Sequence, residues 1–363
     1  MKRREFLKAG GLGVAASAAV AAPAIAQSMP EVKWRLTSSF PKSLDALWGA
    51  SETFAKYCAE ATDGKLQIQT FAGGEIVPAL QALDATSAGN VEMCHTASYY
   101  YYGKDPTWAL FTIVPFGLNT RQLNAWFYDG DGMKLMNDFA KKSNVTAIPG
   151  GNTGAQMGGW FRKEIKEVAD LNGLKFRIAG LAGRTLQKLG VVPQQIAGGD
   201  IYPALEKGTI DAAEWVGPYD DEKLGFQKVA KYYYYPGWWE GCAALHFMIN
   251  TAKWEALPKN YQAVINAAAG YASIEMTARY DARNPQALRR LVSSGAQLRP
   301  FTQPVLEACL KAANEVFAET TAANADFKKV YDAMVAFRND AYLWWQVAEY
   351  TYDNFMIRSR PRG

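Results

Sequence analysis

The alternation of short strand patterns with short helix patterns constrains the fold of this chain more than any other feature. In a first stretch the predicted elements follow the order strand, helix, strand, helix and strand, at residues 32–37, 45–61, 66–71, 79–88 and 91–95. Ser43 is expected to cap the first helix, and Asp63-Gly64 to end it. Strands that alternate with helices in this way are typical of a parallel sheet covered by helices.

A second stretch repeats the alternation and predicts a second sheet. Its strands and helices are expected to alternate at residues 175–178, 183–189, 194–196, 201–207 and 212–215. A further strand at 243–250 is predicted to carry the chain back to the first domain. The rest of the chain is predicted to be helical. A long stretch over 257–292 is expected to be broken or kinked near Asn284-Pro285, because proline removes a helical hydrogen bond.

The length of the chain agrees with two domains of this kind. The 363 residues, less an N-terminal targeting segment, support about two domains. We predict that domain I comprises residues 27–148 and about 243–285, and that domain II comprises residues 149–242. Residues 286–363 are expected to form a C-terminal helical region.

The last helix, predicted over residues 327–357, carries the most regular apolar stripe of the chain. Its members recur every three or four residues and are Val330, Met334, Phe337, Ala341, Trp344, Ala348, Tyr352 and Phe355. Such a stripe packs either against the protein's own domains or against a second copy of the chain. The sequence leaves both alternatives open.

The N-terminus has the features of an export signal. Arg3-Arg4 begins a twin-arginine motif that ends at Lys8, a weakly apolar stretch follows, and Ala24-Ile25-Ala26 is a small-x-small cleavage site. The apolar stretch is too short and too poor in large residues to anchor the chain in a membrane. We therefore predict that residues 1–26 are a twin-arginine signal peptide and that the mature protein is periplasmic.

Charge and composition exclude several functions. The chain has 39 Lys and Arg against 35 Asp and Glu, and without the signal peptide it is nearly neutral, so it lacks the electrostatic footprint of a nucleic-acid-binding protein. The GxSxG, HExxH and P-loop motifs are absent from the sequence. Two His residues are too few for most zinc sites, and the four Cys residues are expected to be buried thiols rather than disulfides.

Two tyrosine tracts and one histidine are candidates to line a cleft. The side chains of Tyr99–Tyr102 and Tyr232–Tyr235 either alternate between core and surface or face a ligand. In a cleft, a tyrosine ring can pack against the ligand and its hydroxyl can form a hydrogen bond with it. Because 13% of the residues are aromatic, we place some of these tyrosines in the cleft, with Tyr100 as a solute contact. His95, at the end of a predicted strand, is either a core residue or a hydrogen-bond donor in the cleft.

Arg177 is the candidate anchor of a binding site. It lies in an otherwise apolar predicted strand, between Phe176 and Ile178, where an unpaired guanidinium is strongly unfavourable. A solute carboxylate would match the guanidinium with two parallel, charge-assisted hydrogen bonds. An internal salt bridge to Asp or Glu would also satisfy it, and the pattern alone does not choose between the two.

Polar side chains in the same region form an oxygen-rich set. Asn152 and Gln156 lie in a glycine-rich loop, Glu214-Trp215 ends a predicted strand, and Glu240 follows two tryptophans. Carboxylate, amide and backbone carbonyl oxygens near an arginine suit a hard cation such as Na⁺, or alternatively Ca²⁺, better than a transition metal. Glutamates that are simply solvated on the surface are the other interpretation of this pattern.

These residues resemble those of the substrate-binding (P) subunit of the tripartite ATP-independent periplasmic (TRAP) transporters. The sequence Gly190-Val191-Val192-Pro193 is followed by Asp-Ile-Tyr-Pro-Ala-Leu-Glu-Lys-Gly-Thr-Ile-Asp-Ala at residues 200–212, and the family has the same motifs in the same order. Leu174-Lys175-Phe176-Arg177 matches the strand that carries the family's carboxylate-binding arginine. The resemblance covers essentially the whole mature chain.

The resemblance is greatest to the branch that binds 2-oxo acids, such as pyruvate, together with sodium. It implies that Arg177 clamps the solute carboxylate and that Gln156, Glu214, Trp215 and Glu240 build or support the cation site. We add Tyr100, His95 and Asn152 as further solute contacts.

The same resemblance implies a fold and partners. It implies a two-domain α/β periplasmic binding protein with a cleft between two sheets, and long C-terminal helices that span the domains or pair two copies into a homodimer. The expected role is a receptor without enzymatic activity that delivers its solute to the small and large TRAP membrane subunits. The alternatives are a 2-hydroxy or aromatic carboxylate as solute, a sensory role, and a periplasmic enzyme that acts on a carboxylate.

Overall fold

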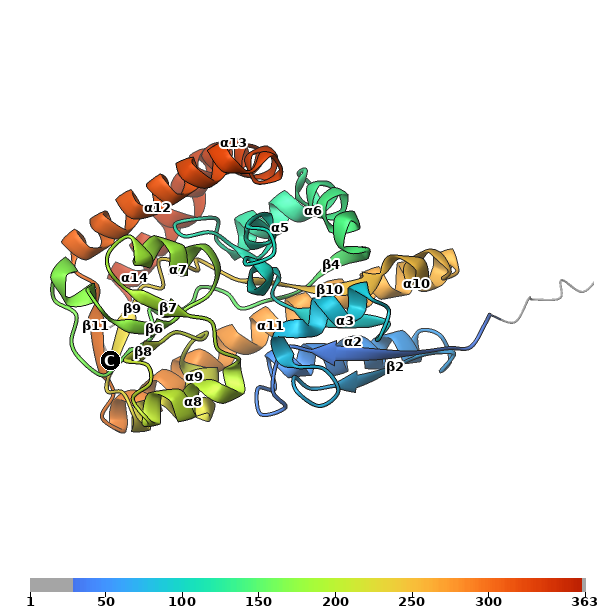
Figure 1. Ribbon diagram of the computed structural model, residues 1–363, viewed down its shortest axis with the longest axis horizontal. Helices are drawn as coiled ribbons and strands as arrows, with labels where there is room; N and C mark the ends of the chain where they lie inside the picture. Colours follow the sequence, from blue (N-terminus) through green and yellow to red (C-terminus); the bar gives the residue numbers. More distant parts are fainter. Residues whose placement is uncertain (1–28, 361–363) are drawn as a thin grey trace, which may run out of the picture. The chain divides into compact units, whose positions relative to one another are not determined.

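The computed structural model describes residues 29–360, and the predicted signal peptide lies outside these described residues. Figure 1 shows two β-sheets with helices packed around them. The first sheet has the strand order β2-β1-β3-β10-β4, with bounds Val32–Ser38 (β1), Leu66–Phe71 (β2), Met93–Thr96 (β3), Val145–Asn152 (β4) and Ala244–Asn250 (β10). We call the part of the chain built on this sheet lobe 1.

The second sheet has six short strands in the order β11-β9-β5-β8-β6-β7. Its bounds are Trp160–Phe161 (β5), Lys175–Arg177 (β6), Val192–Gln194 (β7), Ala212–Ala213 (β8), Tyr232–Tyr235 (β9) and Gln297–Pro300 (β11). We call the part of the chain built on this sheet lobe 2. Both sheets mix parallel and antiparallel pairs, and this architecture agrees with the predicted pair of α/β sheets.

Short helices accompany each sheet. Those of lobe 1 are α2 (Leu47–Glu60), η1 (Ala79–Gln81), α3 (Ala82–Ser87), η2 (Ser98–Tyr101), α4 (Thr107–Thr112), α5 (Thr120–Tyr128), α6 (Gly132–Ala140), η3 (Lys141–Ser143) and α10 (Thr251–Glu255). Those of lobe 2 are η4 (Val168–Leu171), α7 (Gly180–Gln187), α8 (Gly198–Glu206), α9 (Pro218–Leu224) and η5 (Phe226–Lys228).

Long helices complete the chain after lobe 2. They are α11 (Lys259–Ser293), α12 (Gln303–Ala323), α13 (Ala325–Trp345), a π-helical turn η6 (Gln346–Tyr350) and α14 (Thr351–Ser359). Helix α11 contacts α2 and β4 of lobe 1 as well as α9 of lobe 2, and therefore connects the two lobes. None of the helices within residues 29–360 is both long and apolar enough to cross a membrane.

The first sheet forms as its side-chain pattern predicts. β1 pairs in parallel with β2 and β3, and Trp34, Leu36 and Ile68 alternate into the core. β10 is buried along its whole length and runs antiparallel between β3 and β4, so residues 243–250 do return to the first sheet. β4 also belongs to this sheet as far as Asn152, so the chain crosses to lobe 2 after Asn152 rather than at residue 149.

Several local predictions are wrong. Ser43 does not cap α2, which begins at Leu47 after an N-cap residue without a side-chain hydrogen bond, because a turn around buried Leu44 precedes it. The predicted break near Pro285 is absent, since α11 continues through it with Tyr280 and Ala287 fully buried on either side, and the alternative of a kink stays a prediction. Residues 286–363 are not entirely helical, because β11 joins the second sheet beside β9.

The predicted last helix begins on the protein and ends in solvent. Val330 and Met334 are buried against the rest of the chain, whereas Trp344, Tyr352 and Phe355 are each more than 60% exposed. The apolar stripe therefore packs against lobe 1 only in its first half, and its second half remains uncovered in a single chain.

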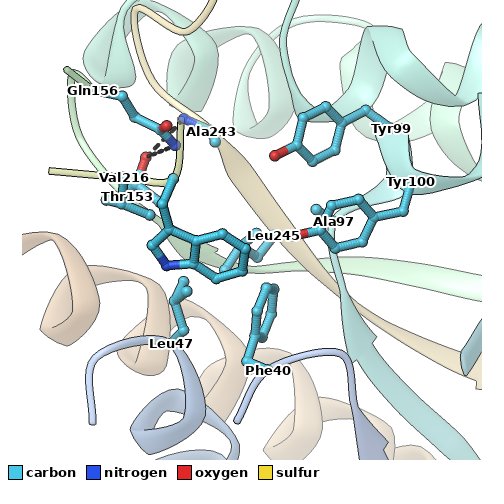
Figure 2. A pocket seen from close by; sticks show the side chains of 11 residues that line it. Phe40, Leu47, Ala97, Tyr99, Tyr100, Thr153, Gln156, Val216, Ala243 and Leu245 are labelled. Atoms are coloured by element: carbon cyan, nitrogen blue, oxygen red, sulfur yellow. Dashed lines mark hydrogen bonds between the residues drawn. The ribbon is translucent and has the colours of Figure 1, made fainter. Parts of the chain in front are cut away.

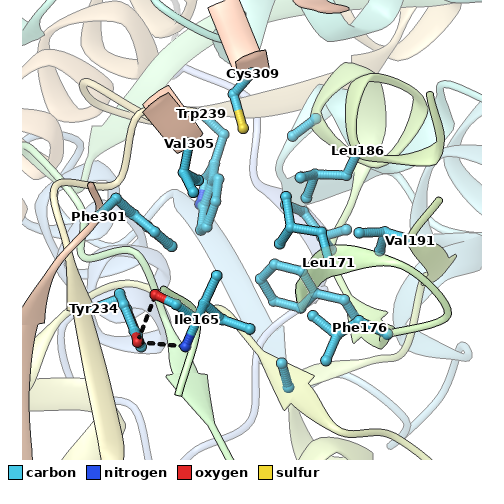
Figure 3. Packing of buried hydrophobic residues seen from close by; sticks show 14 of the residues in the cluster. Ile165, Leu171, Phe176, Leu186, Val191, Tyr234, Trp239, Phe301, Val305 and Cys309 are labelled. Carbon is cyan, nitrogen blue, oxygen red and sulfur yellow. Dashed lines mark hydrogen bonds between the residues drawn. The ribbon is translucent and has the colours of Figure 1, made fainter. Parts of the chain in front are cut away.

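The core of lobe 2 combines an aromatic cluster with two buried carboxylates. Phe161, Phe176, Tyr234 and Trp239 pack with α7 and α12 (Figure 3).

All four cysteines are buried free thiols, as expected. Burial raises the pKa of each of these thiols to about 12.

The two carboxylates lie at the start of α9. Asp220 accepts a hydrogen bond from the Tyr280 hydroxyl at 2.7 Å, and Asp221 accepts from Tyr233 at 2.8 Å and from the Trp160 indole at 3.0 Å. Burial raises the pKa of both carboxyl groups to about 7, against the effect of these donors.

This burial predicts how stability depends on pH. Between about pH 4 and 7 the folded protein holds protons on Asp220 and Asp221 that the unfolded chain releases, so the free energy of unfolding falls as pH rises and levels off above 7. Asp220→Asn keeps an acceptor for Tyr280 and removes one titrating group. We expect the fall in Tm between about pH 5 and 8 to be smaller in this variant than in the wild type, as measured by calorimetry. An equal fall would contradict the account.

Candidate functional site

A narrow cavity lies where the two lobes and the strands that connect them meet. Figure 2 shows Tyr99 and Tyr100 with their hydroxyls toward its interior, and Phe40 and Leu47 on another side. The lining residues are Phe40, Leu47, Ala97, Tyr99 and Tyr100 from lobe 1, Trp215 and Val216 from lobe 2, and Thr153, Gln156, Ala243 and Leu245 from β10 and the connecting segments. Most of this wall is aromatic or aliphatic, with polar groups at a few positions.

Arg177, the last residue of β6, lies beside this cavity and is 1% exposed. Its Nε donates to the Ile196 carbonyl at 3.1 Å, and its Nη1 donates to both the backbone carbonyl and the carboxylate of Glu214. The Trp215 ring lies over the guanidinium, 4.9 Å from ring centroid to carbon. The internal salt bridge that the sequence left open is therefore present.

The salt bridge does not satisfy either partner completely. Nη2 of Arg177 and Oε2 of Glu214 are both buried without a hydrogen-bond partner among residues 29–360. Buried polar atoms are almost always paired in folded proteins, so this donor and this acceptor can each take a further hydrogen bond or ion contact. Arg177 is thus held in place by the chain and keeps one nitrogen available.

The ionisable groups of the site shift one another's pKa. Burial disfavours the charge on Arg177, but the Glu214 carboxylate and the two nearby tyrosines outweigh it and raise the pKa of the guanidinium. Burial raises the pKa of Glu214 to about 7, although Arg177 lowers it. Burial and the charge of Glu214 together raise the pKa of Glu240 well above its ordinary value. Only Glu214 is paired with the guanidinium, and ionising Glu240 as well would place a second negative charge beside the single Arg177.

Gln156 and Glu240 are placed by two segments that cross between the lobes. The backbone N–H of Gln156 donates to the Glu240 carbonyl at 3.1 Å, and the N–H of Gly237 donates to the Gln156 carbonyl at 3.1 Å. A Cβ at position 237 would lie 2.6 Å from that carbonyl oxygen, so this approach requires glycine. The side-chain amide of Gln156 donates to Thr153 Oγ1 at 3.1 Å, as Figure 2 shows.

These groups fit a hard cation. The Oε1 of Gln156 and the Oε2 atoms of Glu214 and Glu240 are buried and lack hydrogen-bond donors within the described part of the chain. Oxygen atoms of amides and carboxylates are the ligands that Na⁺ and Ca²⁺ prefer. Within residues 29–360, no group of three or more His, Cys, Asp and Glu side chains is arranged to hold a metal ion.

The remaining predicted contacts divide between the cavity and the core. Tyr100 lines the cavity, and burial raises the pKa of its hydroxyl to about 12, so it stays protonated and can donate. Asn152 is fully buried behind the lining residue Thr153, and its side-chain nitrogen is unpaired among the described residues. His95 lies in the core, because both ring nitrogens are within 3.1 Å of Ser51 Oγ and the Gly150 carbonyl. His95 is not among the residues that line the cavity and packs against the lining residue Phe40, with the ring centroids 5.6 Å apart.

Eight of the lining residues were not chosen from the sequence, including Tyr99, Thr153, Phe40 and Leu47. Tyr99 belongs to the tyrosine tract and Thr153 to the glycine-rich loop, so their surroundings were informative even though neither was chosen. Phe40 and Leu47 carry no signal of their own, since isolated apolar residues near a helix start are ordinary core residues.

Comparison with known proteins identifies the same family as the sequence motifs. Residues 37–324 match the family model DctP, described as bacterial extracellular solute-binding protein, family 7. The chain belongs to this family of TRAP solute-binding proteins. Family members are substrate-binding receptors and act in the periplasm.

One curated relative and two solved structures are particularly similar. The monocarboxylate 2-oxoacid-binding periplasmic protein of Nostoc sp. is 48% identical over 99% of this chain and 100% of its own length. A TRAP transporter solute-binding protein from Bordetella bronchiseptica is 51% identical with a TM-score of 0.90, and covers 91% of this chain and 98% of its own. That structure is a mixed-occupancy dimer with copurified calcium and picolinate in one active site.

The second structure comes from Pseudoalteromonas atlantica and contains sodium and pyruvate. It is 38% identical, has a TM-score of 0.87, and covers 91% of this chain and 100% of its own. Each of these three proteins matches at least 91% of this chain, so the similarity includes both lobes and the cavity between them.

Two adjacent glycines test how Trp215 is held over Arg177. A Cβ at Gly198 would overlap the Trp215 ring, whereas a Cβ at Gly199 meets no atom within 4 Å. We expect Gly198→Ala to destabilise the protein by about 1–3 kcal/mol through overpacking. The matched Gly199→Ala should be neutral or stabilising by up to about 1 kcal/mol, since alanine favours helix. Chemical unfolding measures both, and equal effects would contradict the packing described.

Proposed function

We propose that this protein is the extracytoplasmic receptor of a TRAP transporter and binds a small 2-oxo monocarboxylate, such as pyruvate, together with Na⁺. The observation that carries the proposal is the group of unpaired buried atoms beside the cavity. One is a donor, Nη2 of Arg177, and three are oxygens of Gln156, Glu214 and Glu240. An anionic solute with a cation would satisfy both kinds at once.

Arg177 is the group that recognises the carboxylate. Its Nη2 donates to a solute oxygen, while Nε and Nη1 remain fixed by Ile196 and Glu214. A charge-assisted hydrogen bond to a buried guanidinium contributes about 1.5–3 kcal/mol. The Trp215 ring packs on the guanidinium, Tyr100 lines the same cavity, and the surrounding apolar side chains exclude water.

Gln156, Glu214 and Glu240 would hold the cation, with Trp215 contributing its backbone carbonyl. Burial raises the pKa of Glu214 and Glu240, and a bound cation would favour the ionised form of both carboxyl groups. The sodium and pyruvate in the relative from Pseudoalteromonas atlantica support this pairing, and the calcium in that from Bordetella bronchiseptica makes Ca²⁺ the alternative ion.

Binding favours closure because the site is assembled from both lobes. Tyr99 and Tyr100 come from lobe 1, and Arg177 and Trp215 from lobe 2. A solute that touches both sets stabilises the closed arrangement more than an open one. The closed receptor then presents its surface to the membrane subunits of a sodium-driven transporter.

Three alternatives are compared by experiment. A 2-hydroxy acid would keep the Arg177 contact, and an aromatic carboxylate is suggested by the picolinate in the relative from Bordetella bronchiseptica. A sensory role would use the same binding site. An enzyme would alter its carboxylate, so recovery of the unchanged solute after denaturation separates a receptor from an enzyme.

The proposal includes export and dimerisation. Residues 1–26 carry the twin-arginine motif and direct the protein to the periplasm through that pathway. The end of α13, η6 and α14 carry large exposed apolar side chains, which are Leu343, Trp344, Val347, Tyr350, Tyr352, Phe355 and Ile357. A patch of this kind marks an interaction site, and we assign it to a second copy of this chain.

Calorimetry with pyruvate tests the binding site. We expect micromolar affinity in NaCl, weaker binding when choline replaces Na⁺, and loss of binding in Arg177→Met. Arg177→Met leaves Glu214 buried and unpaired, which costs about 3–5 kcal/mol of stability, so the double variant Arg177→Met, Glu214→Gln serves as the better-folded form. Folded variants that bind with unchanged affinity, or a wild type that prefers a 2-hydroxy acid, would refute the proposed recognition.

Light scattering with size-exclusion chromatography tests the dimer. Val347 is 71% exposed on the uncovered apolar surface, and Leu310 is 42% exposed on α12. We expect a dimeric wild type, a monomeric Val347→Glu and a dimeric Leu310→Glu, since both variants add the same charge at different surfaces. A monomeric wild type would rule out the dimer at the concentrations used.

A further inference from the structure

A polar contact joins the two lobes at the edge of the cavity, outside the binding site described above. Asp45 precedes α2 in lobe 1, and Tyr219 and Lys223 belong to α9 in lobe 2. The Tyr219 hydroxyl donates to Asp45 Oδ2 at 2.8 Å, and the Lys223 ammonium pairs with Asp45 Oδ1. One carboxylate thus receives two donors from the opposite lobe.

Helix α11 positions both sides of this contact. Arg283 Nη1 donates to the Tyr219 hydroxyl oxygen at 2.9 Å, and the Tyr219 backbone N–H donates to Asn284 Oδ1 at 3.0 Å. Arg279 donates to the backbone carbonyl of Asp45. The Tyr219 hydroxyl accepts from Arg283 and is therefore oriented to donate its own proton to Asp45.

The contact is linked directly to the cavity wall. Leu47 lies two residues after Asp45, and Val216 lies two residues before the start of α9; both line the cavity. Holding Asp45 against α9 therefore keeps Leu47 and Val216 on facing walls. Lobe separation that moves these walls apart has to break the Tyr219 hydrogen bond and the Lys223 ion pair.

The strength of the contact suits a reversible device. The Asp45 side chain is 47% exposed and that of Lys223 is 25% exposed, so water and salt weaken their attraction. Tyr219 is only 8% exposed, and its hydrogen bond to a carboxylate is the better protected part. Such a contact is strong enough to slow opening and too weak to prevent it.

We propose that Asp45, Tyr219 and Lys223 form a latch between the lobes that closes with the cleft and slows solute release, an inference that rests on the proposed receptor function. The three residues do not touch the cavity and act as positioning residues. They therefore affect the dissociation rate and the open–closed equilibrium. The choice of solute depends on the residues that line the cavity.

Two latch variants and one matched control test the inference. Tyr219→Phe removes a single hydroxyl, and Lys223→Met removes the ammonium. Lys188→Met is the control, because Lys188 is 24% exposed and pairs with Glu319 within the α7–α12 contact, away from the cleft. We expect the pyruvate dissociation rate in stopped-flow fluorescence to rise about three- to tenfold in both latch variants and to stay unchanged in the control.

Added salt provides a second readout. With Na⁺ held constant, choline chloride should speed dissociation from the wild type and have less effect on Lys223→Met, because the ion pair is already absent. Equal dissociation rates in the wild type and both latch variants would overturn the latch.

Hydrogen exchange of the ligand-free protein separates this inference from the proposed function. We expect faster exchange over residues 40–47 in both latch variants than in Lys188→Met. If the wild type binds no 2-oxo acid, the proposed function fails, and the exchange measurement alone then decides on the latch. Unchanged exchange in both variants would reject it.

Discussion

The buried ion pair between Arg177 and Glu214 is the interaction on which the rest of the site depends. The chain itself uses two of the three guanidinium nitrogens, Nε and Nη1, and this fixes the direction of the third, Nη2. An arginine that had to be immobilised by its solute would lose more side-chain entropy on binding. Here most of that ordering is complete before a solute arrives, at the cost of two carboxylates buried beside one positive charge.

The position of the acidic groups links binding to the architecture. Glu240 and Gln156 lie on the two segments that cross between the lobes, and their backbones are hydrogen-bonded to each other. Glu214 and Trp215 follow the central strand β8 of lobe 2, whereas the tyrosines reach in from lobe 1. A solute and cation that neutralise these acidic groups therefore also contact both lobes, so binding and closure occur together. The contact of Asp45 with α9 lies outside the binding site and joins the same two lobes.

Much of this could be predicted from the sequence, for identifiable reasons. Arg177 stood out because a charge within an apolar strand requires a partner, and the alternation in β1 and β2 follows directly from one buried face. The ends of elements were less predictable. Ser43 is a good capping residue by type, yet buried Leu44 sets the local turn, and the packing around Pro285 overrides the helix-breaking tendency of proline.

The parts of the site that could not be predicted depend on tertiary contacts. Phe40 and Leu47 line the cavity together with residues of both lobes that are distant in sequence, such as Tyr100 and Trp215. His95 lies in the core instead, where Ser51 and Gly150 satisfy its ring. Sequence spacing contains no information on either arrangement.

A crystal structure of the protein grown with pyruvate and Na⁺ tests the central claim most directly. The account predicts a carboxylate oxygen within hydrogen-bonding distance of Arg177 Nη2, and one cation peak surrounded by oxygens of Gln156, Glu214 and Glu240. A solute bound outside the cavity, with Arg177 still contacting only Glu214 and Ile196, would contradict it.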